Sequence, residues 1–374
     1  MSMRILLSLI LAACFLHACG PGKSSPETII NRVTTQFYDR HHRFSDTMDA
    51  WGDYTLNLTI EALLNYELRT GDRAYSAVTE RFFSLRSYDP GDTILYTSIP
   101  FSNPYYSYYQ IHQDPDFTVP YISESRRMDR ELTRTAEGAI CIEHEGHHRM
   151  LIDYLQYYAI RMARTGMLTG DEAFYEKCVS QFELYRSLLR DQETGLWSQG
   201  RGWLPDSAMV SPGAWSRGHG WLLRGLVTSL EHLPAESIYY ERLLAILESI
   251  SETLHSCRDE DGMWHTLLHL PPSESEPETS GSGMIAYYWS LAVANGYLPE
   301  RPYQAAALQT LSALRNYITP EGLVRNTCEG PGPLRSIEHY HHVPIRPGDP
   351  HGPQAIIYAM TGEMMLRDST LTGQ

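Results

Sequence analysis

The chain has 374 residues and a formal net charge of −15, from 30 Lys and Arg against 45 Asp and Glu. This balance argues against nucleic acid or an anionic membrane surface as a partner, because both require clustered basic side chains. The negative net charge does not exclude an acidic sugar as ligand, since a single Arg can make the electrostatic potential positive at one site. The length is compatible with one large ring-shaped domain or two ordinary ones.

The N-terminus has the pattern of a secretion signal. One basic residue, Arg4, precedes an apolar run over 5–16 that is too short to span a membrane. Cys19 follows Ala and precedes a stretch rich in Gly, Pro and Ser, which resembles a bacterial lipoprotein processing site. We take Cys19 as the lipidated residue; Cys14 has the better local consensus but a shorter apolar run before it.

These features divide the chain into a signal peptide of lipoprotein type over 1–18, a linker over 19–26 and one folded domain over 27–374. The prediction is an exported protein, in the periplasm or on the outer membrane of a Gram-negative bacterium. It would meet a membrane only through its lipid anchor.

Helical periodicity dominates the domain, and sustained strand-type alternation is hard to find. A clear example is the apolar series Tyr239, Leu243, Ile246, Leu247, Ile250 and Leu254. Thr-Gly-Asp occurs at 70–72 and again at 169–171, each time with an aromatic residue three positions after the Asp. Both patterns indicate helices joined by recurring turns.

A second loop pattern, an acidic residue near a Gly that precedes apolar residues, recurs at Gly138, Gly195, Gly262 and Gly322. The spacing is about sixty residues, the length that two helices and two loops occupy. About six such units fit in the domain. We therefore predict an all-α fold of six helical hairpins closed into an (α/α)6 barrel, with an open helical array as the structural alternative.

The block Trp215-Ser-Arg-Gly-His-Gly-Trp221 is the least ordinary stretch of the sequence. The glycines at 218 and 220 suggest a tight loop that leads into the apolar run 221–230, with Arg217 at a helix entrance. An Arg fork between aromatic faces suits a ring-shaped anionic ligand such as a uronic acid. A structural Trp–Arg stack that closes a helix turn is the alternative.

The segment His144-Glu-Gly-His-His148 matches the H-E-x-x-H pattern of zinc hydrolases, which requires both His residues on one helix face. Gly146 in the middle of that helix and the lack of a third ligand at a familiar spacing weaken this interpretation. A His-rich loop before a helix, with imidazoles available to substrate, fits better. We therefore predict no metal and no cofactor.

Two acidic residues stand at the starts of apolar runs. Asp153 lies in an apolar and aromatic segment, where desolvation would raise its pKa into the range useful for proton transfer. A helix N-cap is the alternative role. Glu278 precedes Thr-Ser-Gly-Ser-Gly, which predicts an N-cap before a helix start built of small residues.

Taken in order, these stretches resemble the unsaturated uronyl hydrolases of glycoside hydrolase families 88 and 105, the latter including unsaturated rhamnogalacturonyl hydrolases. The matching stretches are Trp51, Thr70-Gly-Asp72, Arg134-Thr-Ala-Glu-Gly138, Leu151-Ile-Asp153, Asp191 to Trp197, Trp215 to Trp221, Glu278-Thr-Ser280 and His351-Gly352. The Trp-x-Arg-Gly-x-Gly-Trp block is the most specific of them.

The resemblance implies the (α/α)6 barrel and a single catalytic carboxylate, Asp153. The implied reaction is hydration of the vinyl ether of a Δ4,5-unsaturated uronic acid at the non-reducing end of an oligosaccharide, without metal or nucleotide. Arg217 and Trp221 align with residues that line the family's substrate site. The full set of predicted substrate contacts is Arg217, Trp221, Trp215, His219, Gln199, His144 and His148.

The sequence also departs from the family pattern. Leu151 replaces an aromatic residue two before the catalytic Asp, Gln199 replaces a His, and a second acidic residue falls near Thr97 in a loose alignment. These changes concern recognition of substrate hydroxyls more than the chemistry. The imidazoles of His144, His147 or His148 are candidates for a lost contact.

Two other functional classes remain open at this point. One is a helical surface lipoprotein that binds glycans without cleaving them, which leaves Asp153 unexplained. The other is the zinc hydrolase, which predicts bound metal.

Overall fold

A computed structural model describes residues 24–41, 54–84, 99–114, 116–206 and 208–372. The predicted signal peptide with Cys14 and Cys19, and the positions Trp51 and Thr97, lie outside these ranges. In the described chain, no helix is both long enough and apolar enough to cross a membrane.

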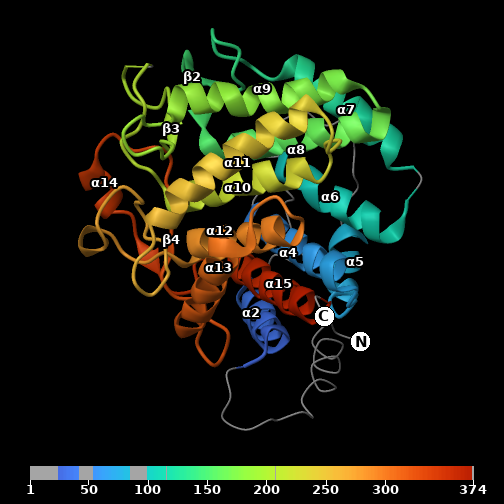
Figure 1. The fold of residues 1–374 in the computed structure, drawn as a ribbon, viewed down its shortest axis with the longest axis vertical. Coiled ribbons are helices and arrows are strands. Elements are labelled where there is room, and N and C mark those ends of the chain that lie inside the picture. The colour runs from blue at the N-terminus through green and yellow to red at the C-terminus, as the bar shows by residue number, and fades with distance from the viewer. Residues whose placement is uncertain (1–23, 42–53, 85–98, 115, 207, 373–374) are drawn as a thin grey trace.

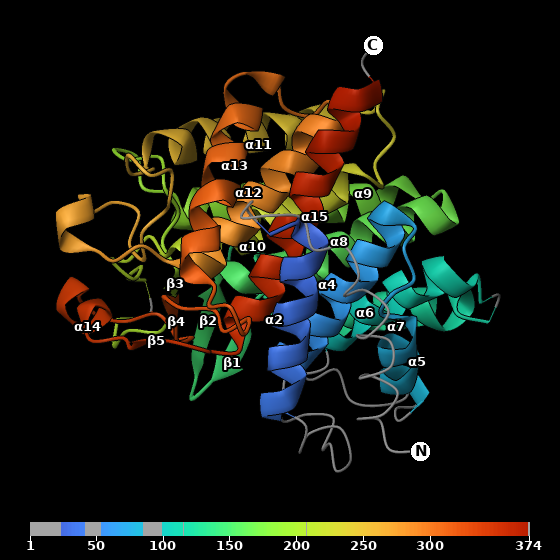
Figure 2. The ribbon, with the colours of Figure 1, turned by 90° about the horizontal axis from the view of Figure 1, so that it is seen from below.

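Six helices of the described chain form an inner ring in which each packs against the next and the last closes on the first. They are α4 (Tyr54–Thr70), α6 (Ile99–His112), α8 (Ile152–Thr169), α10 (Ser216–Leu230), α12 (Thr279–Ala294) and α15 (His351–Thr372). Figures 1 and 2 show them around a common centre.

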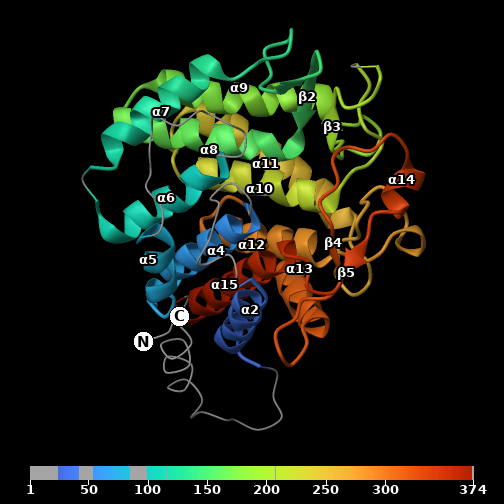
Figure 3. The ribbon, with the colours of Figure 1, turned by 180° about the vertical axis from the view of Figure 1, so that it is seen from behind.

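A second set of helices covers the inner ring and alternates with it along the chain. These are α2 (Pro26–His41), α5 (Ser76–Ser84), α7 (Thr118–Glu131), α9 (Glu172–Leu189), α11 (Ile238–Ser256) and α13 (Glu300–Leu314). The back view in Figure 3 shows the outer helices against the ring. The predicted (α/α)6 barrel is confirmed.

Smaller elements lie in the connections. The strands are β1 (Ile142–His144), β2 (His147–Leu151), β3 (Gly200–Arg201), β4 (Thr327–Cys328) and β5 (Ile345–Arg346). The order β1-β2-β3 makes one antiparallel sheet, and β4-β5 makes another. Short helical turns are η1 (Pro272–Glu274), η2 (Arg315–Tyr317) and α14 (Ile337–His341).

The two helix layers follow from their sequence patterns. The inner helix α12 is apolar or small on every side and is buried over nearly its whole length, as expected for a helix enclosed by neighbours. The outer helix α11 buries one stripe, which includes Leu243, Leu247 and Leu254, and exposes the rest. Tyr239, the first member of the predicted apolar series, is only half-buried.

The sixty-residue repeat has a common structural cause. Gly138, Gly195, Gly262 and Gly322 all adopt positive φ, between 77° and 94°, which favours glycine. At Gly138, Gly262 and Gly322 the glycine N–H donates to the carbonyl of the residue three positions earlier. The N–H of that earlier residue donates in turn to the carbonyl of the residue directly after the glycine. These turns connect outer helices to the following inner helices.

The Thr-Gly-Asp motifs make the opposite connection, from an inner helix to the next outer one. Gly71 and Gly170 have φ values of 72° and 70°, and each following Asp accepts a backbone N–H two residues later. The short turns therefore border one mouth of the ring. The long loops border the other mouth, where the inner helices begin.

The predicted loop at the Trp215 block is wrong. Helix α10 already starts at Ser216, so Gly218 and Gly220 lie inside it. A Cβ at Gly218 would come within 2.8 Å of Ile152 Cγ2, and one at Gly220 within 2.8 Å of Met284 Cβ. The glycines are required for close helix packing rather than for a turn. Arg217 lies at the helix entrance, as predicted.

Gly281 tests this packing. Its Cβ would lie 2.8 Å from the Arg217 amide nitrogen and 2.6 Å from Ser216 Oγ, so α10 and α12 must separate to admit it. We expect Gly281→Ala to lower the free energy of unfolding by about 1–3 kcal/mol, measured by urea denaturation. Gly332→Ala is the control, because its Cβ meets Trp203 no closer than 3.5 Å. Equal stability of the two variants would contradict this account.

Candidate active site

Asp153 lies at the mouth of the ring where the inner helices begin. It is the second residue of α8, and the N-cap position belongs to Leu151. The carboxylate accepts a hydrogen bond from its own backbone N–H, and the residue as a whole is half-buried. Burial raises the pKa of Asp153 to about 6, although the charge of Arg217 opposes the rise. The carboxyl group can therefore exchange a proton near neutral pH.

Arg217 lies beside Asp153 at the start of α10. Its Nη1 donates to Ser280 Oγ at 2.9 Å and to the Cys328 carbonyl at 2.7 Å, and its Nη2 donates to the Glu329 carbonyl at 3.0 Å. Among the described residues these bonds occupy three of the five guanidinium N–H groups. The other two N–H groups make no hydrogen bond to the described residues. The buried guanidinium is thus held rigidly by neutral acceptors.

The carboxylate of Glu278 supports this arrangement. It caps α12 by accepting the N–H groups of Ser280 and Gly281, as the sequence predicted, and also accepts the N–H of Cys328. Its Oε1 lies 4.0 Å from Arg217 Nη1. A fully buried carboxylate with these donors fixes the α10, α12 and 328–329 segments relative to one another.

A chain of polar groups that sequence reasoning did not assemble lies at the same mouth. His351 begins α15, and its Nδ1 lies 2.6 Å from Asp349 Oδ1, which also accepts the His351 backbone N–H at 3.0 Å. Tyr54, the first residue of α4, hydrogen-bonds His351 Nε2. Burial, with the charge of Arg217, lowers the pKa of His351. The only sequence signal was the His351-Gly352 pair.

His219 is turned into the protein, and its predicted contact with substrate stays a prediction. It is fully buried; its Nδ1 hydrogen-bonds the Trp215 carbonyl at 2.8 Å, and its Nε2 accepts the Trp197 N–H at 3.0 Å. Burial lowers its pKa to about 4, so the ring stays neutral. The imidazole joins the 197 loop to α10.

The two tryptophans of the block are also buried. Trp215 is 2% exposed and packs against Tyr340, with ring centroids 5.7 Å apart. Trp221, one helical turn beyond Arg217, is 3% exposed and has the Arg224 guanidinium 5.5 Å from its ring centre. In this structure neither ring offers an open stacking face. Both rings pack inside the protein next to the candidate site. A stacking contact of Trp221 with substrate stays a prediction.

Gln199, which the resemblance predicts at the position of a family His, is turned inward. Its Nε2 donates to the Pro331 carbonyl at 2.9 Å, and its Oε1 accepts the Tyr340 hydroxyl at 2.5 Å. Both ends of the amide are satisfied within the protein. Gln199 therefore joins two loops of this mouth and is not presented to a ligand.

The H-E-x-x-H segment is a β-hairpin, not a helix. His144 and His147 face each other across the β1–β2 pair, whereas His148 is opposite Glu143, so the zincin geometry is absent. In the described ranges, no three His, Cys, Asp or Glu side chains are grouped to hold a metal. His144 and His148 are exposed on the hairpin that leads directly into α8. Their contact with substrate stays a prediction.

The comparison with protein families matches residues 27–367 to Glycosyl Hydrolase Family 88, as the resemblance predicted. The fold is thus that of a glycoside hydrolase family. The chain belongs to Glycosyl Hydrolase Family 88.

Two curated relatives are each 26% identical. One is the unsaturated rhamnogalacturonyl hydrolase YesR of Bacillus subtilis (strain 168), matched over 214 residues, 52% of this chain and 54% of the relative. The other is the unsaturated 3S-rhamnoglycuronyl hydrolase of Alteromonas sp. (strain LOR), matched over 149 residues, 39% of this chain and 32% of the relative. The chain thus matches about half the length of the first relative and about a third of the second.

Solved structures share the fold. A possible member of the GH105 family from Salmonella enterica serovar Paratyphi A is 25% identical, with a TM-score of 0.77 over 96% of this chain and 98% of that one. The unsaturated glucuronyl hydrolase of Bacillus sp. GL1 has a TM-score of 0.64 at 18% identity, over 90% and 96% of the two chains.

The effect of Arg217 on Asp153 can be measured without any substrate. Because the guanidinium lowers the pKa of Asp153, Arg217→Met should raise that pKa further above about 6. A titration of the side-chain carboxyl carbon by NMR measures the shift. Arg242→Met, which removes an Arg on the outer helix α11 paired with Glu176 and Glu183, should leave it unchanged. An unchanged value in Arg217→Met would show that the two groups are not coupled.

Proposed function

We propose that this protein is a glycosidase that removes a Δ4,5-unsaturated uronic acid from the non-reducing end of lyase-generated oligosaccharides. The observation that carries the proposal is Asp153, a carboxyl group with a raised pKa beside a fixed guanidinium at the mouth of an (α/α)6 ring. Membership of Glycosyl Hydrolase Family 88 and the names of the curated relatives support it.

The chemistry needs one group that first gives and then takes a proton. Protonated Asp153 donates to C4 of the C4=C5 bond, and positive charge develops at C5 and the ring oxygen. Water adds to C5 and returns a proton to the Asp153 carboxylate. The C5 hemiketal then opens to a ketone as the C5–O5 bond breaks. The hemiacetal left at C1 collapses to an aldehyde and releases the neighbouring sugar.

Arg217 suits the role of binding the substrate carboxylate, which is bonded to C5. Arg217 begins an inner helix at the same mouth as Asp153, and the bonds to Ser280 and Glu329 fix its position before substrate arrives. Tyr54 and His351, on adjacent inner helices, hydrogen-bond each other at this mouth, and we assign this pair to the wall of the substrate site. Each of these roles is part of the proposal.

Absorbance of the C4=C5 bond in the ultraviolet follows the reaction directly. With unsaturated disaccharides from pectin, glycosaminoglycan, ulvan and arabinogalactan digests, we expect loss of absorbance with at least one substrate. Asp153→Asn should slow it by about 10²- to 10⁴-fold, the usual contribution of a general acid. Asp261→Asn, which changes an exposed loop carboxylate, is the matched control.

Failure on every uronide, or full activity in Asp153→Asn, would overturn the proposal. Saturable binding without turnover would instead indicate the glycan-binding alternative. Chelator-sensitive activity with stoichiometric zinc would indicate a metal mechanism.

The pH dependence has a definite sign. The first step needs Asp153 protonated, and its pKa is about 6, so kcat/KM should fall as the pH rises through that value. A pH profile between 4 and 9 tests this, with the melting temperature followed in parallel to exclude unfolding. Activity that increases steadily from pH 6 to pH 8 would rule out Asp153 as the proton donor.

We also propose that the protein is exported and anchored by a lipid on Cys19. The support is the sequence pattern of the N-terminus alone. Mass spectrometry of the membrane-extracted protein tests it: a diacylglyceryl adduct on Cys19 is expected, and an intact N-terminal methionine would contradict it.

A further inference from the structure

A second guanidinium group lies at the same mouth of the ring as Asp153. Arg149 belongs to β2, four residues before Asp153, and that strand leads directly into α8. Burial raises the pKa of Tyr154, the charge of Asp153 adds to the rise, and the charge of Arg149 opposes it. The Tyr154 hydroxyl is therefore within electrostatic reach of both groups. This relation places Arg149 beside the entrance to the candidate active site.

The Arg149 guanidinium lacks the hydrogen bonds that hold its neighbours. Arg217 donates to three acceptors, and Arg201 on β3 donates to Glu137 at 2.9 Å. The Arg149 side chain makes no hydrogen bond to the described residues, and its ion-pair partner there is Glu145, with Oε2 3.6 Å from Nη2. The Glu145 side chain is 75% exposed, and a loose pair of this kind contributes little.

A ligand can reach the end of the Arg149 side chain. The side chain keeps 19% of its surface exposed. Its Nε is buried without a partner, whereas Nη1 and Nη2 are not among the buried nitrogens. Donors that have no acceptor within the protein are costly to shield from water unless a ligand supplies one. The terminal nitrogens of Arg149 are therefore candidates for contact with a ligand.

Trp203 holds the Arg149 side chain in place. The guanidinium carbon lies 5.1 Å from the centre of the Trp203 ring, which is a cation–π contact. The half-buried indole is fixed in turn, because its Nε1 donates to the Met150 carbonyl at 2.7 Å. An aromatic ring orders the guanidinium without accepting its in-plane N–H groups. Arg149 is thus oriented before a ligand arrives.

One loop connects Trp203 with the rest of the candidate site. The Glu329 carbonyl in this loop accepts from Arg217, and a Cβ at Gly332 would lie 3.5 Å from the Trp203 ring. The two contacts are three residues apart along the chain, which corresponds to at most roughly 10 Å. Arg217 and the Trp203 ring therefore border one mouth, at a separation within the span of a disaccharide.

The two guanidinium groups differ in their effect on Asp153. Burial raises the pKa of Asp153 and the charge of Arg217 opposes the rise, whereas the charge of Arg149 acts on Tyr154. Because the effect of a charge falls with distance, Arg149 is farther than Arg217 from the carboxyl group that reacts. In the proposed reaction Arg217 binds the carboxylate on C5. An anion bound by Arg149 then belongs to the neighbouring sugar.

We propose that Arg149, held over Trp203, binds an anionic substituent on the sugar that the reaction releases, either a sulfate ester or a carboxylate. The planar guanidinium presents parallel donors that match two oxygens of either group. The inference rests on the proposed function and narrows its substrates to oligosaccharides whose second sugar is acidic.

Binding is measured apart from catalysis by calorimetric titration of the Asp153→Asn protein. One pair of probes is unsaturated chondroitin disaccharides with and without sulfate on the second sugar. The other pair is unsaturated pectin disaccharides in which the second sugar is galacturonate or rhamnose. Adding Arg149→Met should weaken binding of the sulfated or the carboxylated member about tenfold to a hundredfold and change binding of the neutral members little. The pair that responds identifies the anion.

Two further variants serve as controls. Arg201→Met removes a guanidinium from the same sheet that is already paired with Glu137, so both affinities should stay unchanged. Arg149→Lys keeps the charge without the planar fork and should retain part of the preference for the anionic member.

Equal loss of binding for anionic and neutral members in Arg149→Met would show that Arg149 only supports the hairpin, and would overturn the proposal. Unchanged binding of all members, or no binding of any, would overturn it as well. Binding that depends on Arg149 and on the anion, without turnover by the unmodified protein, would instead overturn the proposed reaction and leave this site standing.

Discussion

The carboxylate of Glu278 is the interaction on which the candidate active site depends. A buried carboxylate is costly unless donors surround it, and Glu278 has five, three of them backbone N–H groups. These donors come from the start of α10, the start of α12 and the 328 segment. The same contacts fix the acceptors that hold Arg217, and Arg217 in turn moderates the pKa of Asp153.

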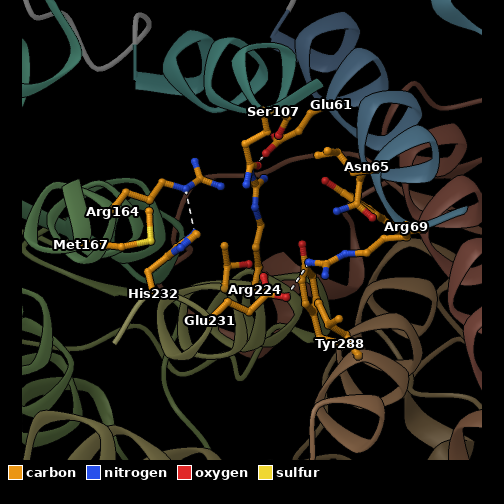
Figure 4. Close-up of a pocket in the computed structure, with 15 residues that line it drawn as sticks. Glu61, Asn65, Arg69, Ser107, Arg164, Met167, Arg224, Glu231, His232 and Tyr288 are labelled. Carbon is orange, nitrogen blue, oxygen red and sulfur yellow. Dashed lines mark hydrogen bonds and ion pairs between the residues drawn. The ribbon is translucent and has the colours of Figure 1, made fainter. Parts of the chain in front are cut away.

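The two mouths of the ring differ in their loops and in the side chains that line them. Long loops with small sheets surround the starts of the inner helices, and they carry Asp153, Arg217 and His351. Short Thr-Gly-Asp turns follow the ends of α4 and α8, and a polar cavity of about 420 Å³ lined by Arg69, Arg164 and Arg224 lies near these helix ends (Figure 4). Between the mouths, the Arg224–Glu61 pair and buried tyrosines fill the ring. The two mouths therefore differ in the length of their loops and in the side chains that they carry.

Several residues of the Trp215 block act by packing rather than by contact with a ligand. Gly218 and Gly220 let α8 and α12 approach α10, and His219 and Trp215 join α10 to neighbouring loops. Gln199 joins two further loops through its amide. This packing holds Arg217 rigidly at the entrance of α10, because each neighbour of the Arg is itself fixed. The most specific sequence motif is therefore mainly a support for one functional side chain.

The sequence by itself determined the repeat, the helical hairpins, the Glu278 cap and the position of Asp153 at a helix start, because local periodicity and turn chemistry encode them. Only the tertiary structure decided which side chains face a ligand. His219 accepts the N–H of Trp197, and Gln199 bonds the Pro331 carbonyl and the Tyr340 hydroxyl, all distant in sequence. His144 and His148 lie on a hairpin, and Tyr54 meets His351 through ring closure. The polar cavity near Arg69, Arg164 and Arg224 also arises only in the tertiary structure, since its residues come from helices spread over the whole ring and no local pattern marks their convergence.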